Sequence, residues 1–310
     1  MSSMKQPWES WVLSQTDAEA IAGVARVQSL WGGYGELLRV QFPDRPSAIL
    51  KRVLPPPPDD SSTSDRRKRH SYRVELAWYR NGAPLCQERC RVAKLLGWQT
   101  EGEQMMLLLE DLQASGFAPA RPPDSKQRKA GICWLANFHA RFLHQVPEGL
   151  WPQGGYWHLE TRPDEWNRMP SSPWKTHAMA IDIALRSARY KTLVHGDSKP
   201  ANFLWDAHGN AAAVDFQYVG QGCGIRDVAY FLDCCFGESL DDELLQVWLN
   251  LYFQTLRKAV DSDIDDLEAE WRALFPAAWS DYQRFYLGWS GSARMGTWSH
   301  SQLDQALALL

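Results

Sequence analysis

The chain has 310 residues, a formal net charge of −4 and a pI near 6.1. This mildly acidic balance argues against a general nucleic-acid-binding protein, and the absence of any run of about 18 apolar residues argues against a membrane span. The N-terminus lacks the apolar core of a secretory signal, so we expect a cytoplasmic protein. The length is sufficient for two lobes with separate hydrophobic cores.

Six cysteines are scattered through apolar segments and do not suggest a disulfide framework. Cys86 and Cys90 could share one face of a helix, but no second pair of Cys or His follows at zinc-binding spacing. Buried, reduced thiols are therefore the better interpretation. Most of the 16 tryptophans are expected in the core, because a large amphipathic ring usually buries its area.

The first 112 residues contain the alternating patterns of a small antiparallel sheet. A short helix is expected before it, over residues 17–23, ending at Gly23. A basic helix is expected after the third strand, from Asp65 to Tyr79. The expected strands are residues 25–31, 36–42, 47–54, 91–98 and 104–109.

Residues 55–64 form a segment of four prolines followed by small and acidic residues. Prolines lack a backbone donor, and the other residues cannot build a core. We therefore predict an exposed, mobile loop here.

Later in the chain the apolar spacing becomes helical, over residues 125–145, 174–190 and 226–310. Before this change, an apolar strand ends in two carboxylates, Glu110 and Asp111, which suits a hinge between lobes. We therefore predict an α+β fold with an N-terminal lobe of residues 1–112 and a C-terminal lobe of residues 113–310.

The most informative feature is the pair of segments His195-Gly-Asp-Ser-Lys-Pro-Ala-Asn-Phe-Leu204 and Val214-Asp-Phe-Gln217. They contain Asp197, Asn202 five residues later, and Asp215 eighteen residues after Asp197. Phosphoryl transfer needs such a set: one carboxylate orients the acceptor hydroxyl, while an amide and a second carboxylate hold metal ions on the nucleotide phosphates. The pattern therefore indicates a phosphotransferase.

The pattern H-x-D-x-K-P-x-N followed by D-F resembles the catalytic and metal-binding loops of the protein-kinase-like fold. Gly196 and Gln217 make it similar to the small-molecule branch, the aminoglycoside phosphotransferase and choline kinase group, and especially to ecdysteroid-kinase-like families. The resemblance implies a bilobal fold with a small antiparallel sheet in the N-terminal lobe and a larger, mostly helical C-terminal lobe. It implies ATP and Mg²⁺ as cofactors, with transfer to a hydroxyl group of a small molecule.

The same resemblance implies roles for the loop residues. Asp197 is expected to accept the proton of the acceptor hydroxyl. Asn202 and Asp215 are expected to bind Mg²⁺, which prefers oxygen ligands. Lys199 resembles the lysine that neutralises the transferred phosphoryl group, but many small-molecule kinases have no lysine there, so its direct role stays open. His195 is expected to position the loop rather than to act as a base.

The N-terminal lobe is expected to hold the nucleotide. Lys51 resembles the strand lysine that meets the α- and β-phosphates, and Glu75 is its expected helical partner. By resemblance alone, Glu110 and Leu112 would offer backbone groups to adenine.

A glycine-rich turn separates the first two predicted strands. Its glycines, Gly32, Gly33 and Gly35, would let backbone amides approach the phosphates. The spacing departs from the fuller G-x-G-x-x-G pattern, so a plain hairpin turn is a serious alternative.

Two other functions stay open on the sequence. A protein kinase is disfavoured, because only eight residues separate Gln217 from Arg226, too few for an activation segment, and no A-P-E motif follows. A pseudokinase or nucleotide-binding scaffold would be expected to lack one of the phosphate, base or metal residues, and none is missing.

The motifs do not determine the acceptor. Residues 238–270 contain ten acidic residues against Arg257 and Lys258, so this stretch could attract a cationic amino alcohol or an aminoglycoside-like acceptor. A solvated helix face is the more conservative interpretation. Aromatic residues could instead enclose a quaternary ammonium or a flat sterol-like acceptor, although core packing is the better expectation for most of them. They are Trp248, Tyr252, Trp289 and Trp298. The sequence predicts no oligomeric state.

Overall fold

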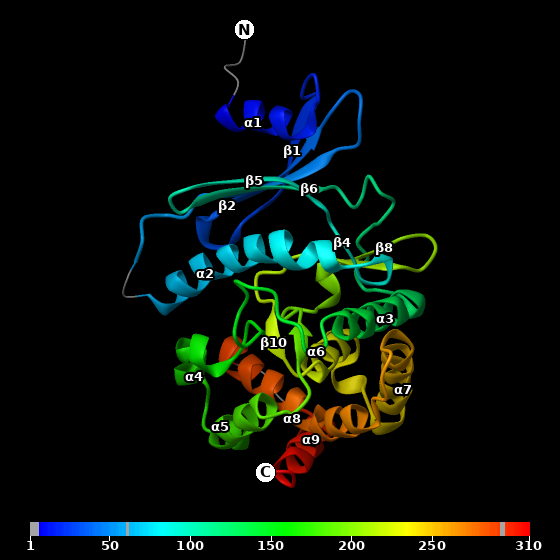
Figure 1. Ribbon diagram of the computed structural model, residues 1–310. Helices are drawn as coiled ribbons and strands as arrows, with labels where there is room; N and C mark the ends of the chain where they lie inside the picture. The colour runs from blue at the N-terminus through cyan, green and yellow to red at the C-terminus, as the bar shows by residue number, and fades with distance from the viewer. Residues whose placement is uncertain (1–5, 60–61, 292–294) are drawn as a thin grey trace.

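The computed structural model describes residues 6–59, 62–291 and 295–310. An antiparallel sheet of five strands forms the N-terminal part, and helices form most of the C-terminal part (Figure 1). Helix α2, Thr63–Ala77, lies across the middle of the view between them. This architecture confirms the predicted α+β fold class.

The strand order in the large sheet is β1-β2-β3-β6-β5, and every neighbouring pair is antiparallel. Leu50 and Leu108 cluster with helix α1 on one side, whereas Val53 and Leu107 belong to the larger core on the other. The sheet is therefore covered on both faces. The bounds are α1 Pro7–Thr16, β1 Gly23–Ser29, β2 Gly35–Gln41, β3 Ala48–Val53, β5 Leu95–Glu101 and β6 Gln104–Glu110.

The helix predicted over residues 17–23 is wrong, because the N-terminal helix α1 ends at Thr16. Asp17 takes the left-handed conformation (φ 52°), which stops the helix. Two sequence signals of α1 were missed. Pro7 occupies its first turn, and Trp8 and Val12 lie four residues apart on its buried face.

The strand predicted over residues 91–98 is divided in two. Strand β4, Arg91–Val92, pairs in parallel with β9, Ala211–Ala213, in a small sheet of the C-terminal part. Strand β5 begins only at Leu95 and joins the large sheet. A boundary after residue 112 would separate the paired strands β4 and β9, and this division into lobes stays a prediction.

Helix α2 has a defined start and an irregular end. The Ser62 side chain caps it by accepting a hydrogen bond from the Asp65 amide (3.1 Å). The loop predicted over residues 55–64 is therefore shorter, and residues 60–61 within it lie outside the described residues. A π-helical turn, Trp78–Gly82, follows α2, and such turns are frequent near functional sites.

The C-terminal part consists of helices around two small sheets, β4-β9-β8 and β7-β10. Helix α3 packs against α7, and the long helix α8 packs against α5, α6 and α9. Among the described residues, no helix is long and apolar enough to cross a membrane. The bounds are α3 Ser125–Arg141, α4 Pro163–Arg168, α5 Pro173–Arg186, β7 Thr192–Val194, β8 Phe203–Trp205, β10 Gly220–Gly222, α6 Ile225–Phe236, α7 Asp242–Ala259, α8 Asp265–Ser290 and α9 Thr297–Leu307.

A buried aromatic cluster joins the end of α2 to the C-terminal part. The centroid of the Trp78 ring lies 5.6 Å from that of Phe138 on α3 and 4.6 Å from that of Phe216. All three side chains are fully buried. Because Phe216 directly follows Asp215, this packing fixes the segment that carries Asp215 against α2.

We expect Trp78→Ala to destabilise the fold by about 3–5 kcal/mol, because it removes a fully buried ring and leaves a cavity. Trp78→Phe should cost much less. It keeps a ring and removes an indole N–H that has no hydrogen-bond partner among the described residues. Chemical denaturation followed by circular dichroism measures both losses. Equal losses for the two variants would contradict the packing role of the ring.

A hydrogen bond between α6 and α8 engages a carboxyl group that is partly buried. The Gln283 amide donates to Asp233 Oδ1 at 2.7 Å. Burial, opposed by this bond and reinforced by nearby Glu238, raises the pKa of Asp233 to about 6. Between the usual pKa of 3.8 and about 6, the folded state binds more protons than the unfolded state. This group therefore lowers the stability of the fold as the pH rises through that window.

Asp233→Asn removes the ionisation, while its side-chain oxygen can still accept the hydrogen bond from Gln283. We expect the melting temperature to rise by about 2–4 °C at pH 7.5. The gain should shrink to about half of that at pH 5, where the folded-state carboxyl is already mostly protonated. Scanning calorimetry at the two pH values measures it. A gain of the same size at both would show that the carboxyl is not held in its neutral form by burial.

Candidate active site

The loop that follows β7 is aligned by His195, whose side chain is fully buried. His195 Nδ1 accepts a hydrogen bond from the Asp197 amide (3.2 Å), and Nε2 lies 3.1 Å from the Val214 carbonyl. Burial lowers the pKa of His195, which favours the neutral ring that this pair of contacts requires. Gly196 has φ +79°, and a Cβ there would collide with the Tyr218 carbonyl, so the position requires glycine.

A second buried residue, Asp227 on α6, holds the same loop. Its carboxylate accepts hydrogen bonds from the amides of His195 (2.5 Å) and Gly196 (3.0 Å), and His139 Nε2 lies 3.3 Å away. Its backbone carbonyl accepts a hydrogen bond from the Ser198 hydroxyl (2.9 Å). Burial alone would raise the pKa of Asp227, but the hydrogen bond with His139 and the neighbouring donors lower it, so the group stays ionised.

Asp197 is only 6% exposed, and three side chains surround its carboxylate. Lys199 Nζ lies 2.7 Å from Oδ2, and Asn202 Nδ2 donates to the same oxygen at 2.9 Å. The Tyr230 hydroxyl donates to Oδ1 at 3.3 Å. Burial, opposed by Lys199 and reinforced by Asp215, raises the pKa of Asp197 to about 6. The carboxylate is thus fixed in orientation and has an increased proton affinity.

Asp215 lies next to Asn202, because the Val214 amide donates to the Asn202 carbonyl (2.9 Å). Asp215 has φ 68°, a conformation uncommon outside glycine and frequent at functional sites. Its Oδ1 is buried and has no hydrogen-bond partner among the described residues. The Asn202 Nδ2 is engaged by Asp197, which leaves its amide oxygen for another ligand.

These two oxygen donors, one of them orphaned, fit Mg²⁺, a hard cation that usually takes its other ligands from water and phosphates. Within the described residues, no cluster of three or more His, Cys, Asp or Glu side chains could hold a metal ion. A metal ion bound by Asn202 and Asp215 would therefore depend on a ligand that brings its own oxygens, such as a nucleotide.

Lys51 and Glu75 form a buried ion pair with Nζ–Oε2 distance 2.6 Å. Asp215 Oδ1 lies 3.9 Å from the same ammonium group. Burial lowers the pKa of Lys51, but the carboxylates of Glu75 and Asp215 outweigh it and hold the pKa above its usual value. The predicted partners therefore meet, and they connect β3 and α2 with the segment that carries Asp215.

The glycine-rich segment is a turn between β1 and β2, as the hairpin alternative anticipated. Gly32 and Gly33 have φ of 68° and 76°. At Gly35 a Cβ would collide with the Arg52 carbonyl, so glycine permits the close approach of β2 to β3. Tyr34 points inward and stacks on Tyr72 of α2 (centroids 5.9 Å apart). Contact of this turn with phosphates stays a prediction.

The expected hinge residues are partly engaged within the protein. The Glu110 side chain pairs with Arg91. The backbone amide of Glu110 donates to the Lys94 carbonyl (2.9 Å). The Leu112 carbonyl accepts hydrogen bonds from the amides of Ser115 (3.1 Å) and Phe117 (2.9 Å). These bonds limit which backbone groups could meet adenine, and the contact stays a prediction.

Sequence reasoning missed two contacts of the site. Tyr230 reaches Asp197 because it lies three residues after Asp227 on the same face of α6, a spacing that was visible in the sequence. The Ser71 hydroxyl of α2 donates to Gln217 Oε1 at 3.2 Å. No sequence signal pairs these two positions, which are 146 residues apart. Both contacts link the site to the helices that frame it.

The acidic stretch 238–270 is mostly engaged away from Asp197. Glu270 accepts hydrogen bonds from the amides of Arg189 and Tyr190, and Glu268 pairs with Arg257 and Arg272. Its carboxylates thus serve local structure, which supports the conservative interpretation. Of the four aromatic candidates, Trp248 and Tyr252 are buried core residues, Trp298 donates to Asp242, and Trp289 is exposed.

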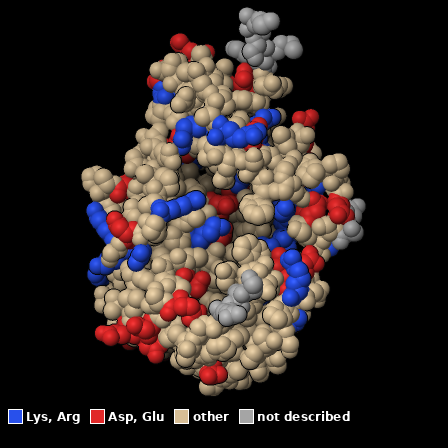
Figure 2. Space-filling view, turned by 180° about the vertical axis from the view of Figure 1, so that it is seen from behind, with Lys and Arg blue, Asp and Glu red and all other residues tan. Residues whose placement is uncertain are grey.

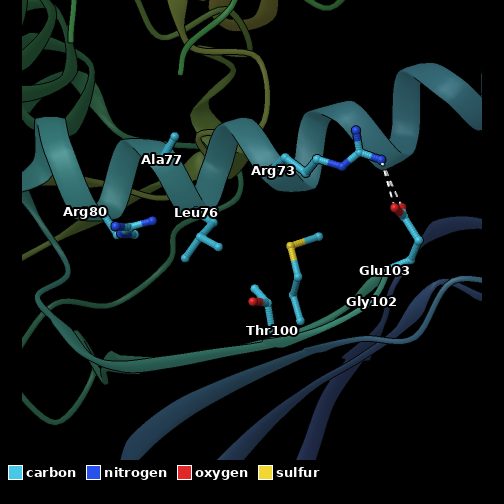
Figure 3. A pocket seen from close by; sticks show the side chains of 8 residues that line it. Arg73, Leu76, Ala77, Arg80, Thr100, Gly102 and Glu103 are labelled. Carbon is cyan, nitrogen blue, oxygen red and sulfur yellow. Dashed lines mark hydrogen bonds and ion pairs between the residues drawn. The ribbon is translucent and has the colours of Figure 1, made fainter. Parts of the chain in front are cut away.

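Two surface hollows, one beside α2 and one beside the π-helical turn that follows it, are lined by none of the predicted site residues. The smaller, about 240 Å³, lies between α2 and the β5–β6 hairpin, where Arg73 pairs with Glu103 (2.9 Å; Figure 3). The larger, about 760 Å³, is lined by residues around the π-helical turn and β4. On the opposite side of the molecule the surface is hollowed between its upper and lower parts, with acidic side chains inside and basic ones around it (Figure 2).

A comparison with protein-family models matches residues 30–261 to the phosphotransferase enzyme family. A comparison with curated proteins gives no match. A solved microcompartment-associated aminopropanol kinase is similar, with TM-score 0.57 and 13% identity over 96% of this chain and 94% of that chain. An amicoumacin kinase in complex with AMP-PNP and Ca²⁺ has TM-score 0.55 and 16% identity, covering 96% and 91%. A thermostable mutant of an aminoglycoside phosphotransferase with ADP and hygromycin B has TM-score 0.51 and 12% identity, covering 93% and 100%.

The family match spans more than half of the chain and includes every predicted base, metal and lysine position. At these low identities, the structural similarity shows a shared kinase-like fold. The narrower resemblance to ecdysteroid-kinase-like families stays a prediction. The chain belongs to the phosphotransferase enzyme family, and it has the kinase-like fold of the solved structures named above.

Proposed function

We propose that the protein is an ATP- and Mg²⁺-dependent phosphotransferase that phosphorylates a hydroxyl group of a small molecule. The observation that carries the proposal is the orphaned, buried Asp215 Oδ1, which lies beside Asn202 and 3.9 Å from the Lys51 ammonium. A buried carboxylate oxygen without a hydrogen-bond partner among the described residues is costly, and a metal-bound nucleotide would supply the missing ligand. One similar structure binds AMP-PNP with Ca²⁺ and another binds ADP, which supports nucleotide use.

In this proposal Asp197 orients the acceptor hydroxyl and takes its proton as the oxygen forms a bond to the terminal phosphorus. The bond between that phosphorus and the bridging oxygen breaks, and ADP leaves. Bound Mg²⁺ would neutralise charge on the phosphates. Lys51 would bind the inner phosphates, held in place by Glu75. Lys199 keeps one Asp197 oxygen engaged, so Oδ1, on the Tyr230 side, is the oxygen that would face the acceptor.

We propose an acceptor among amino alcohols, aminoglycoside-like molecules and sterol-like molecules. The similar structures named above act on aminopropanol, amicoumacin and an aminoglycoside, which supports the first two classes. A peptide acceptor is disfavoured, because the segment between Gln217 and α6 is occupied by β10, which pairs with β7. Too little chain is left there for a peptide platform.

Incubation with labelled ATP, Mg²⁺ and a library of these three acceptor classes should give a labelled small-molecule product together with ADP. Omission of Mg²⁺ should abolish it, because Asn202 and Asp215 alone do not bind the phosphates. Chromatography with mass detection identifies the product. Label transferred to protein substrates, with none on any hydroxyl compound, would contradict the proposal.

Two carboxylate variants separate the base from the metal ligand. Asp197→Asn should keep most nucleotide affinity and cut turnover by about a hundredfold or more, because it deletes the proton acceptor. Asp215→Ala should weaken binding of the magnesium–nucleotide complex itself, because it deletes a charged oxygen ligand. Isothermal titration calorimetry and turnover measure the two effects.

Asp304→Asn is a matched control, since Asp304 is exposed on α9 and should change neither quantity. Equal loss of ATP binding in the Asp197 and Asp215 variants would show that the two roles are assigned wrongly.

A further inference from the structure

Helix α2 presents one side to the site. Glu75 on this side reaches Lys51, and Ser71 reaches Gln217. Lys68 lies three residues before Ser71 and seven before Glu75, so it shares their face of the helix. Seven residues of helix correspond to about 10 Å of rise. Lys68 is therefore displaced from the Lys51–Glu75 pair along α2, towards its N-terminus.

The Lys68 ammonium lies against the glycine-rich turn between β1 and β2. It sits over the Tyr34 ring, 4.9 Å from the centroid. A Cβ placed on Gly32 would collide with Lys68 Nζ, so the two approach within contact distance. The lysine thus packs against the turn.

Lys68 has positively charged neighbours and, in the part of the chain that the structure describes, no acidic side chain bound to its ammonium group. Within the described residues, its ammonium group makes neither an ion pair nor a hydrogen bond. Partial burial lowers the pKa of Lys68, and the charges of Arg67 and Arg162 add to this effect, whereas the carboxylate of Asp65 opposes it. The acid closest along the helix, Asp65, is already bound by Arg69 and Tyr34. A half-buried cation without a counter-charge is costly, and an anionic ligand would relieve that cost.

A series of neighbouring groups leads from Lys68 towards Asp197. The charge of Arg162 lowers the pKa of Lys68. The Arg162 guanidinium carbon lies 5.2 Å from the centroid of the Tyr156 ring. The Tyr156 hydroxyl is 3.5 Å from the Tyr230 hydroxyl, which donates to Asp197. Lys51 lies at the other end, between Glu75 and Asp215. A polyphosphate chain that passes Lys51 and presents its last phosphorus near Asp197 would approach the Lys68 ammonium.

We propose that Lys68 binds the terminal phosphate of the nucleotide, the group that is transferred, while Lys51 binds the inner phosphates. This inference rests on the proposed function of the same site. A lysine is suited to the task, because its ammonium acts as a point charge with rotatable donors and can follow a phosphoryl group as it moves.

The test compares the affinities of ATP, ADP and AMP, each with Mg²⁺, by isothermal titration calorimetry. Lys68→Gln should weaken ATP binding about tenfold or more, the size of one charge-assisted hydrogen bond. It should weaken ADP binding by less than about twofold and leave AMP unchanged. Lys68→Arg should retain most of the ATP affinity, because it keeps the charge. Arg73→Gln is the matched control, since Arg73 is on the same helix but pairs with Glu103 at the surface (Figure 3).

The result that overturns the inference is an unchanged ratio of ATP to ADP affinity in Lys68→Gln. This covers both a variant equal to the wild type and one that weakens all three nucleotides alike, as a merely structural change would. If that ratio is unchanged while the wild type binds ATP and Asp215→Ala weakens this binding, the proposed role of Lys68 is refuted and the proposed function still stands. If the wild type shows no magnesium-dependent ATP binding, the proposed function fails, and the inference fails with it.

Discussion

The site depends on the hydrogen bonds that the buried carboxylate of Asp227 accepts from the backbone of the catalytic loop. A charge without exposure to water is tolerated only when donors surround it, and here two of the donors are the amides of His195 and Gly196. For both amides to donate to one carboxylate, the chain turns at Gly196, whose φ of +79° favours glycine. The next residue, Asp197, is thereby directed away from Asp227 towards Lys199 and Tyr230. The geometry of the proposed base is thus a consequence of a structural charge that never meets the substrate.

Helix α2 transmits this arrangement to the N-terminal sheet. Glu75 binds Lys51 of β3, Ser71 binds Gln217, and Trp78 stacks on Phe216. The last two contacts hold the short segment that carries Asp215, and the first holds Lys51, whose ammonium lies 3.9 Å from Asp215 Oδ1. Because Ser71 and Glu75 belong to α2 and Trp78 directly follows it, a displacement of α2 would move Lys51 and the Asp215 segment together. This coupling explains why residues up to 164 positions apart, Lys51 and Asp215, form one site.

Much of the fold and of the site could be predicted from the sequence, because local patterns carry those parts. Alternating strands such as β2 and β3, and the Asp197, Asn202 and Asp215 spacing, depend on neighbours in the chain. The errors have physical causes. The short strand β4 owes its place to a tertiary partner, β9, which a local pattern does not contain.

Other features of the site gain their meaning only from contacts between segments that are distant in the chain. Lys68 belongs to a basic run that resembles a solvated helix face, and only the position of Gly32 over its ammonium makes it distinctive. The Tyr230 contact follows from helix periodicity, but it has meaning only once Asp227 is known to hold the loop.

The most direct test of the central claim is a crystal structure with a non-hydrolysable ATP analogue and Mg²⁺. We predict a metal ion bound by the Asn202 amide oxygen and the Asp215 carboxylate, with Lys51 on the inner phosphates. The terminal phosphate should point towards Asp197. A nucleotide bound elsewhere, or a metal ion held without either Asn202 or Asp215, would contradict the account.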